Sequence, residues 1–466
     1  MLIRSTVHST RRSLFPIRSQ PRSRTMSSTI NGTTNAVQGK IPLPAPRFAK
    51  VTEDVWTMIN TAAAESPKQP ICNLGQGFMN FLPPHYVTEA VKETIDQIPS
   101  NQYSPPRGRP RLLQALSTAY SPFFSPTLGG RPLNPNTEIV VTAGANEGIL
   151  AALTAFVGEG DEVIVMEPYF DQYISNIEMQ GAKVVYVPIR PPANGNVNNP
   201  ASEWKLEMEE LEGKVTEKTK CVILNTPHNP IGKVFSRDEL VQIGEIAERH
   251  NLLIISDEVY DRLSFREGGH QRIATLSPAL YARTLTVGSA GKTFGCTGWR
   301  VGWLLGPEHL IKFVLAAHTR ITFCVNSPMQ EAIATGFERA EEEGYYTETV
   351  AEYKKRYEIL CGVFDKLGLP YTIPDGGYFL LVNFSRVQIP STYTFPTTIQ
   401  SRARDFKLAY WLTREIGVVA IPPTEFFTEE NWGLAEDYLR FAVCKTEGTL
   451  VEAGRRLEKL KEFIRD

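Results

Sequence analysis

The chain has few cysteines, and their spacing matches no metal or disulfide motif. Six are scattered over 466 residues without a C-x-x-C pair. Structural zinc sites and disulfide-rich scaffolds need cysteines at short, regular spacings, so both are excluded and no metal site is predicted. We expect inert thiols in a reducing compartment. The cysteines are Cys72, Cys221, Cys296, Cys324, Cys361 and Cys444.

The sequence also lacks a strong charge excess and a long apolar run. Its formal net charge of −2 gives no electrostatic basis for binding nucleic acid or an anionic membrane. No uncharged apolar run reaches the roughly 18 residues of a membrane-spanning helix, so we predict a soluble protein. With 42% hydrophobic and 21% charged residues, the composition is that of a folded globular protein.

Acidic residues are absent from the N-terminal part, where the first is Glu53. Residues 1–40 combine arginines with serines and threonines, which is typical of a mitochondrial transit peptide. The alternative is a disordered basic tail without a targeting role, and a start at Met26 would give a cytoplasmic form. A proline-rich arm follows, and we expect folded structure to begin near Phe48.

Residues 136–305 alternate short β-branched runs with helical patterns, which predicts an α/β domain with a mostly parallel, seven-stranded sheet. Ligands of such sheets bind at the carboxyl ends of the strands. We assign residues 90–326 to this large domain. The expected strands are Ile139–Thr142, Val163–Met166, Val184–Val187, Cys221–Leu224, Leu253–Ser256, Thr284–Gly288 and Arg300–Leu304.

The remaining residues predict a smaller α+β domain, formed by 327–466 with part of 41–89. Long charged helical patterns surround a few apolar runs there. The expected helices are Met329–Glu343, Thr347–Leu367, Ala403–Ile416 and Gly448–Ile464, and the expected strands are Tyr378–Val382, Val418–Ile421 and Leu439–Val443.

Chemically active residues follow several of the large-domain strands. Asp257 ends one strand and Lys292 follows another among small residues, where a desolvated amine can act as a nucleophile. The segment 143–148 precedes a helix and offers free N–H groups to an anion. A stiff turn, 225–232, carries two asparagines. Each feature also has a plain structural reading: a helix cap, a surface charge or a chain reversal.

Two nucleotide-binding motifs are excluded. The segment ending in Gly291-Lys292-Thr293 imitates a phosphate-binding P-loop, but Thr286 stands where that motif needs glycine. Gly75-Gln76-Gly77 lacks the third glycine of a dinucleotide fingerprint and precedes no helix pattern.

Several of these motifs, in this order, resemble class I/II aminotransferases, the pyridoxal-phosphate enzymes of fold type I. The similarity is strongest to the branch of kynurenine aminotransferase, glutamine transaminase K and cysteine-S-conjugate β-lyase, and it extends from about Phe48 to the C-terminus. The motifs that carry it are Asn73–Phe78, Asn101–Tyr103, Asn225–Gly232, Asp257–Tyr260, Gly288–Phe294, Thr297–Arg300 and Tyr438–Phe441.

The resemblance implies roles around pyridoxal 5′-phosphate. Lys292 bonds to the cofactor and later moves the proton at Cα, Asp257 pairs with the ring nitrogen, and Tyr260 and Asn229 bind the ring's phenolic oxygen. Phe170 stacks on the ring. The phosphate is assigned to Ala145, Asn146, Ser289 and Arg300, with Tyr103 from the neighbouring subunit of a homodimer.

The resemblance also implies a substrate site. Arg440 binds the α-carboxylate with help from Asn229 and the Gly77 backbone, since a buried guanidinium needs a partner. The alternative for Arg440 is a structural salt bridge. The walls of the side-chain pocket are assigned to Trp56, Tyr103, Tyr169, Phe323 and Phe379.

This sequence departs from the family pattern at a few positions. Mammalian members have an aromatic residue at the position of Asn146 and a histidine at that of Cys324. Met79-Asn80 replaces Pro-Asp, and His228 replaces asparagine as a predicted turn residue. We therefore expect the cofactor chemistry to be kept, whereas these departures leave room for a different substrate.

The resulting hypothesis is transamination of kynurenine, or of a similar aromatic or sulfur amino acid, with a 2-oxo acid such as 2-oxoglutarate. With kynurenine the product would cyclise to kynurenate. Alternatives are β-elimination from cysteine S-conjugates, a general aromatic or glutamine aminotransferase, and a non-enzymatic cofactor-binding regulator. The partners expected are small-molecule substrates and a second copy of the chain.

Overall fold

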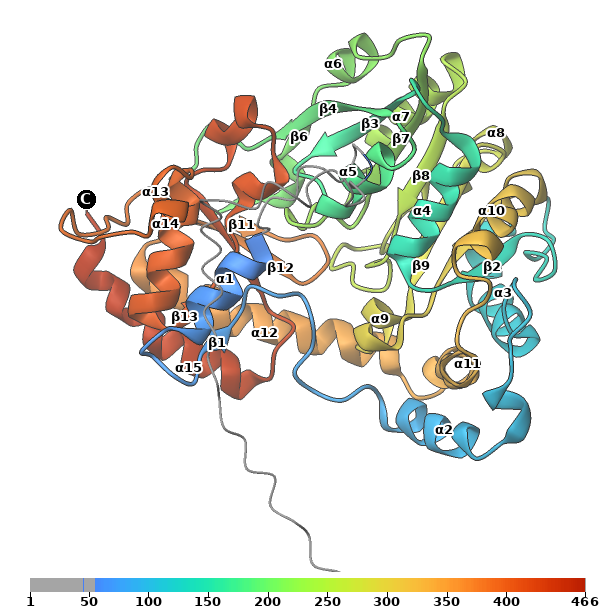
Figure 1. Ribbon diagram of the computed structural model, residues 1–466, viewed down its shortest axis with the longest axis horizontal. Helices are drawn as coiled ribbons and strands as arrows, with labels where there is room; N and C mark the ends of the chain where they lie inside the picture. Colours follow the sequence, from blue (N-terminus) through green and yellow to red (C-terminus); the bar gives the residue numbers. More distant parts are fainter. Residues whose placement is uncertain (1–44, 46–54, 466) are drawn as a thin grey trace, which may run out of the picture. The chain divides into compact units, whose positions relative to one another are not determined.

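An eight-stranded sheet forms the centre of the fold in the computed structural model, which describes Ala45 and residues 55–465 (Figure 1). The strand order is β2-β10-β9-β8-β7-β3-β4-β6. The neighbours from β9 to β4 are parallel, whereas β10 is antiparallel to β2 and β9, and β6 to β4. The strands are β2 (Ile139–Thr142), β3 (Glu162–Glu167), β4 (Lys183–Arg190), β6 (Lys205–Leu206), β7 (Thr219–Asn225), β8 (Leu253–Asp257), β9 (Thr284–Ser289) and β10 (Gly302–Leu305).

All seven expected strands are present, but two details of the prediction were wrong. The sheet has an eighth strand, β6, whose two residues are too few to produce a recognisable sequence pattern. The last expected strand begins at Gly302 rather than at Arg300. Arg300 has a φ of 55°, and this left-handed backbone cannot continue a strand.

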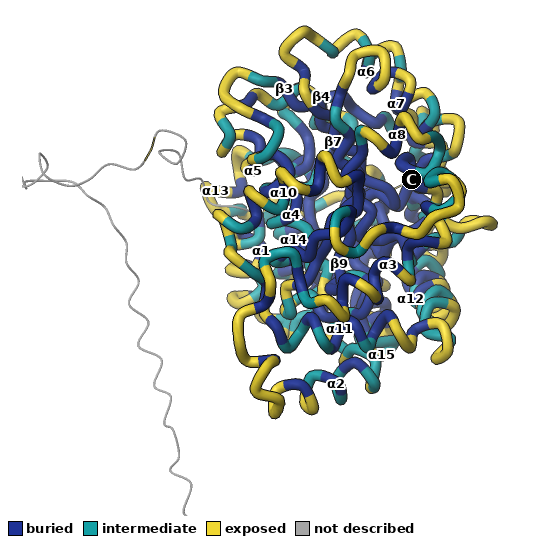
Figure 2. Tube along the Cα trace, turned by 90° about the vertical axis from the view of Figure 1, so that its right-hand side faces the viewer, coloured by how far each residue is buried: buried dark blue, intermediate teal, exposed yellow. Residues whose placement is uncertain are grey.

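Helices cover both faces of the sheet. β2, β3, β9 and β10 are buried at every residue, which explains why these strands lack apolar–polar alternation. Figure 2 shows the buried segments gathered in the interior. One face shares a core with α4 (Ala145–Phe156), α5 (Asp171–Glu178) and α10 (Glu308–Ile321). The other face packs against α3 (Pro110–Phe124), α7 (Arg237–Arg249), α8 (Pro278–Tyr281) and α11 (Ser327–Ala340).

A separate apolar core, called the second core below, contains residues of α1, β1 and most of the C-terminal elements. Here β12 pairs antiparallel with β14, and β1 pairs parallel with β13. Helix α14 continues into a π-helical turn, Leu412–Ile416, within the helix expected to end at Ile416. The elements are α1 (Val55–Ala64), β1 (Cys72–Asn73), α12 (Tyr345–Leu367), β11 (Thr372–Ile373), β12 (Phe379–Asn383), α13 (Thr397–Gln400), α14 (Arg404–Trp411), β13 (Val418–Val419), β14 (Tyr438–Ala442) and α15 (Glu447–Leu457).

The remaining elements are short or connect these parts: α2 (His85–Ile95), β5 (Asn199–Pro200), α6 (Met208–Gly213) and α9 (Ala290–Thr293). The predicted leader and the expected start near Phe48 lie outside the described residues, so the mitochondrial address and the start at Met26 stay predictions, as do the domain boundaries. Within the described part of the chain, no helix is both long and apolar enough to span a bilayer.

Helix α7 begins with a capping box formed by Ser236 and Glu239. The Ser236 hydroxyl accepts the Glu239 N–H at 3.2 Å, and the Glu239 carboxylate accepts the Ser236 N–H at 2.8 Å. The same carboxylate group lies 2.8 Å from the ammonium of Lys233, a side chain without solvent exposure. The cap therefore fixes both the helix start and a buried charge.

Replacing Ser236 by alanine removes the acceptor for the Glu239 N–H. Loss of such a cap costs about 1 kcal/mol, so the urea concentration at the unfolding midpoint should fall. Ser236→Thr keeps the hydroxyl and serves as the matched control. Equal midpoints for the alanine variant and the parent would contradict a stabilising role for the cap.

Candidate active site

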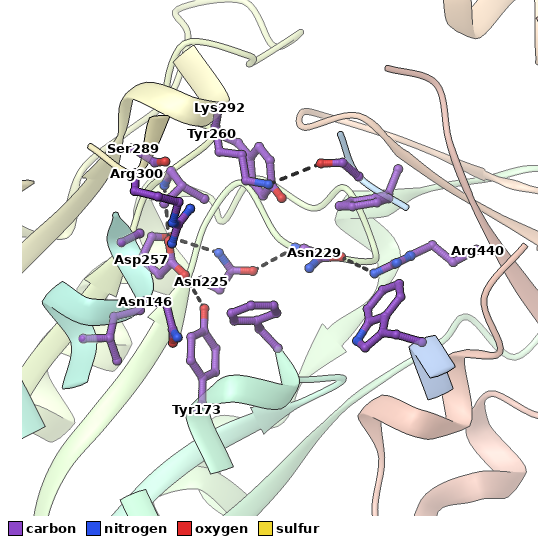
Figure 3. A pocket seen from close by; sticks show the side chains of 17 residues that line it. Asn146, Tyr173, Asn225, Asn229, Asp257, Tyr260, Ser289, Lys292, Arg300 and Arg440 are labelled. Carbon is purple, nitrogen blue, oxygen red and sulfur yellow. Dashed lines mark hydrogen bonds between the residues drawn. The ribbon is translucent and has the colours of Figure 1, made fainter. Parts of the chain in front are cut away.

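Three adjacent parallel strands bring polar side chains to the same edge of the sheet. β7 ends at Asn225, β8 at Asp257 and β9 at Ser289, and Asn225 pairs directly with Asp257 in the sheet register. The Asn225 amide donates to the Asp257 carbonyl at 3.0 Å. Lys292 follows on α9. These polar side chains therefore lie together at the carboxyl ends of the strands, as the sequence predicts (Figure 3).

A pocket of about 840 Å³, including its part open to solvent, lies at this edge. It is lined by Trp56, Gly77, Ala145, Asn146, Ile149, Phe170, Tyr173, Asn225, Asn229, Asp257, Val259, Tyr260, Ser289, Lys292, Arg300, Phe379 and Arg440. Every residue predicted to bind the cofactor or the substrate carboxylate is in this set except Tyr103.

The Lys292 amine is placed by two oxygen atoms. It donates to the Tyr378 hydroxyl at 2.8 Å and to the Gly77 carbonyl at 3.4 Å. Loss of hydration lowers the pKa of Lys292 to about 8, because burial disfavours the charged ammonium. A substantial neutral fraction therefore exists near neutral pH, as a nucleophilic or basic lysine requires.

Asp257 is 5% exposed and is bonded through both carboxylate oxygens. The Tyr173 hydroxyl donates to Oδ2, and the Val259 N–H donates to Oδ1 at 3.3 Å. Burial raises the pKa of Asp257 to about 6, while these hydrogen bonds and the nearby Lys292 oppose the rise. A carboxylate in this position favours a positively charged partner in the pocket.

The start of α4 forms an anion cradle with Arg300. Gly144 has a φ of 87°, and a Cβ at this position would lie 2.6 Å from the Arg300 guanidinium. Glycine is therefore required for both the backbone conformation and the close approach of the arginine. Ala145 and Asn146 occupy the first turn of α4, where backbone N–H groups have no partner within the helix. The buried Ser289 lines the same side of the pocket as Arg300.

Arg440 lies on the other side of the pocket, on β14 (Figure 3). It is 2% exposed; its guanidinium donates to Asn229 Oδ1 at 3.1 Å and to the Gly75 carbonyl at 3.0 Å, and its Nε has no partner. Burial lowers its pKa to about 10. Among the described residues no carboxylate lies at ion-pair distance from this guanidinium, which can therefore bind a ligand carboxylate. The alternative of a structural salt bridge stays open.

Tyr103 lies outside the pocket. Its side chain is 83% exposed and contacts Phe323 edge-on, with ring centroids 5.5 Å apart. Of the other predicted pocket walls, Trp56 and Phe379 line the pocket, whereas Tyr169 and Phe323 do not. The interpretation that Tyr103 completes a neighbouring subunit's site stays a prediction.

The unusual positions of this sequence have different surroundings. Asn146 accepts a hydrogen bond from the Asn176 amide at 2.9 Å at the pocket wall. Cys324 lies beside Tyr103 in a separate groove. The turn prediction for His228 is confirmed, because its N–H donates to the Lys233 carbonyl and its own carbonyl accepts the Gly232 N–H.

The sequence reasoning missed three polar residues of the site: Tyr173, Asn225 and Tyr378. Asn225 had a usable signal, because it directly follows the predicted strand Cys221–Leu224 and is one of the two asparagines of the predicted turn. Tyr173 follows Phe170 by one helical turn, which could have placed both on the same face of α5. Tyr378 had no local signal, because its contact with Lys292 joins residues 86 positions apart.

Comparisons with known proteins identify the family. The sequence profile described as "Aminotransferase class I and II" matches residues 69–457. The chain is 47% identical over 424 residues to the Saccharomyces cerevisiae protein named "Probable kynurenine--oxoglutarate transaminase BNA3", covering 89% of this chain and 94% of that protein. It is 39% identical over 429 residues to a Dictyostelium discoideum protein named kynurenine–oxoglutarate transaminase, covering 90% of this chain and 97% of that protein.

Solved structures agree with this result. The crystal structure of Bna3p from Saccharomyces cerevisiae has a TM-score of 0.88 at 47% identity and covers 91% of this chain and 100% of its own. YbdL from Escherichia coli, described as having a methionine aminotransferase function, has a TM-score of 0.78 at 30% identity. The match covers 90% of this chain and 100% of the YbdL chain. The fold-class prediction is confirmed, and the chain belongs to the class I and II aminotransferases.

Proposed function

We propose that this chain uses pyridoxal 5′-phosphate to transfer the amino group of kynurenine, or of a similar aromatic or sulfur amino acid, to a 2-oxo acid. The observation that carries the proposal is the arrangement of one pocket. A lysine with a lowered pKa and a buried carboxylate lie between an anion cradle and a buried arginine that has no carboxylate partner among the described residues.

The residues present fit this cofactor. The space kept open by Gly144, with Arg300 and the first N–H groups of α4, suits a phosphate group. Asp257 can hold a proton at a ring nitrogen, and Lys292 supplies the amine that reacts with an aldehyde. Phe170 lines the pocket as an aromatic wall for a flat ring.

The proposed reaction distributes its steps among the pocket residues. When bound, pyridoxal phosphate takes up the electron pair left on Cα after its proton is removed. Arg440 binds the α-carboxylate of the amino acid through two parallel hydrogen bonds and so orients Cα. Lys292, as a neutral amine, accepts the proton from Cα. Trp56 and Phe379 offer apolar surface to the side chain of the substrate.

The choice of kynurenine rests on the relatives. Two proteins 47% and 39% identical over most of this chain carry the name kynurenine–oxoglutarate transaminase, which supports kynurenine as donor and 2-oxoglutarate as acceptor. The methionine aminotransferase function described for YbdL supports testing sulfur amino acids beside it.

Adding kynurenine alone to the cofactor-loaded protein should convert the bound cofactor to its aminated form, with a change in the absorption spectrum. Lys292→Ala should slow this half-reaction by about 10²-fold to 10⁴-fold, because a positioned acid–base group is lost. Stopped-flow absorbance measures both rates.

Methionine, phenylalanine and a cysteine S-conjugate serve as parallel donors. Release of pyruvate from the conjugate faster than conversion of kynurenine would favour β-elimination over transamination. Cofactor binding without conversion by any donor would contradict an enzymatic role and favour a regulator. No bound cofactor in the wild type would contradict the site assignment itself.

We also propose a homodimer in which Tyr103 completes the phosphate site of the partner subunit. Its high exposure and its distance from the pocket of its own chain support this arrangement. Tyr103→Phe should then bind the cofactor at least about tenfold more weakly, because a hydrogen bond to a charged group is lost.

Mixing two inactive variants tests the sharing of sites. A hybrid of Lys292→Ala with Tyr103→Ala subunits carries both changes in one site and none in the other. The hybrid should therefore recover about half of the activity of a wild-type dimer, measured after subunit exchange. Hybrids as inactive as their parents would contradict shared sites.

A further inference from the structure

The hydroxyl of Tyr378 joins the amine of Lys292 to the backbone of the second core. It accepts a hydrogen bond from Lys292 Nζ at 2.8 Å and donates one to the Gly77 carbonyl, also at 2.8 Å. Lys292 reaches the same carbonyl at 3.4 Å. Within the described residues these two oxygens are the hydrogen-bond partners of the amine.

Packing fixes the Tyr378 ring and therefore its hydroxyl. The residue has no solvent exposure. Its ring lies nearly parallel to that of Tyr353, with centroids 6.1 Å apart, and edge-on to that of Tyr260 at 5.0 Å. Movement of the hydroxyl would disturb this aromatic cluster, so the oxygen is a preorganised acceptor.

We propose that Tyr378 is a positioning residue that holds the free amine of Lys292 in the orientation needed for proton transfer at Cα. The inference rests on the transamination proposed above and extends it to a residue with no direct contact with the substrate. It assigns the hydroxyl of Tyr378, rather than its ring, to the reaction.

The proton balance follows from the two hydrogen bonds. Neutral Lys292 directs N–H groups to the Tyr378 oxygen and the Gly77 carbonyl, which leaves its lone pair free for Cα. The Cα–H bond breaks as the new N–H bond to Lys292 forms, and the electron pair of the broken bond stays on Cα. The resulting ammonium keeps both acceptors, which stabilise its positive charge.

The phenol itself does not exchange its proton in this scheme. Burial raises the pKa of Tyr378 well above its ordinary value, so the hydroxyl stays protonated. Its proton is directed to the Gly77 carbonyl, and its oxygen is available to Lys292. Tyr378 therefore orients and stabilises the base without replacing it.

Tyr378→Phe tests the inference, because it deletes the oxygen and keeps the ring. The matched control is Tyr357→Phe: Tyr357 is also buried, and its hydroxyl donates to the carbonyls of Gly377 and Phe379 on both sides of Tyr378. The control thus removes a hydroxyl from the same core without touching Lys292.

In the holoenzyme, Tyr378→Phe should lower kcat with kynurenine by about tenfold to hundredfold at nearly unchanged KM, because the base is misplaced. The rate difference between Cα–H and Cα–D substrate should grow as proton transfer becomes slower. Tyr357→Phe should keep kcat and the isotope effect close to those of the wild type.

A second readout does not depend on turnover. Competitive labelling of the cofactor-free full chain with acetic anhydride, quantified on the Lys292 peptide across pH, reports the pKa of this amine. We expect a midpoint near 8 in the wild type and a lower one in Tyr378→Phe, because the ammonium loses an acceptor that stabilises it. Tyr357→Phe should match the wild type.

The outcomes separate two failures. A wild type that transaminates none of the donors overturns the proposed function. An active wild type with an equally active Tyr378→Phe variant, or with equal losses in both phenylalanine variants, overturns the positioning role. An unchanged labelling midpoint in Tyr378→Phe also overturns it.

Discussion

Loss of hydration in a single pocket governs the chemistry of this protein. Lys292, Asp257 and Arg440 would each be fully charged in water, but burial lowers the pKa of both cations and raises that of the carboxylate. Water solvates these groups less than it would at the surface, so each depends on protein atoms that are fixed in place. The surrounding structure serves to hold those atoms where the charges need them.

The pocket is built from both apolar cores. The sheet supplies Asp257 at the end of β8, whereas β12 and β14 of the second core carry Phe379 and Arg440. The Gly77 segment connects the two, because it accepts hydrogen bonds from Lys292 and Tyr378. A change in how the two cores pack would therefore alter the environment of the lysine, and not merely the shape of the cavity.

Two of the positions at which this sequence departs from the expected family pattern, Asn146 and Cys324, have different surroundings. Asn146 lies in the anion cradle, where Asn176 fixes its side chain. Cys324 lies beside the exposed Tyr103, outside the pocket of its own chain. Trp56 and Phe379 thus form the apolar walls that this chain itself supplies, and an effect of Cys324 on substrate choice would require a second subunit.

The sequence alone determined seven of the eight strands of the sheet and most of the site. Asp257, Lys292 and Arg300 lie within short motifs whose spacing is set by local backbone geometry, and the capping box of α7 involves residues three apart. The tertiary structure decided what no local pattern encodes: the hydrogen bonds of Arg440 to Asn229 and the Gly75 carbonyl, the Tyr173 hydroxyl on Asp257, and the contact of Tyr378 with Lys292. These depend on side chains far apart in the sequence, whose approach is fixed by the packing of two cores rather than by any periodicity.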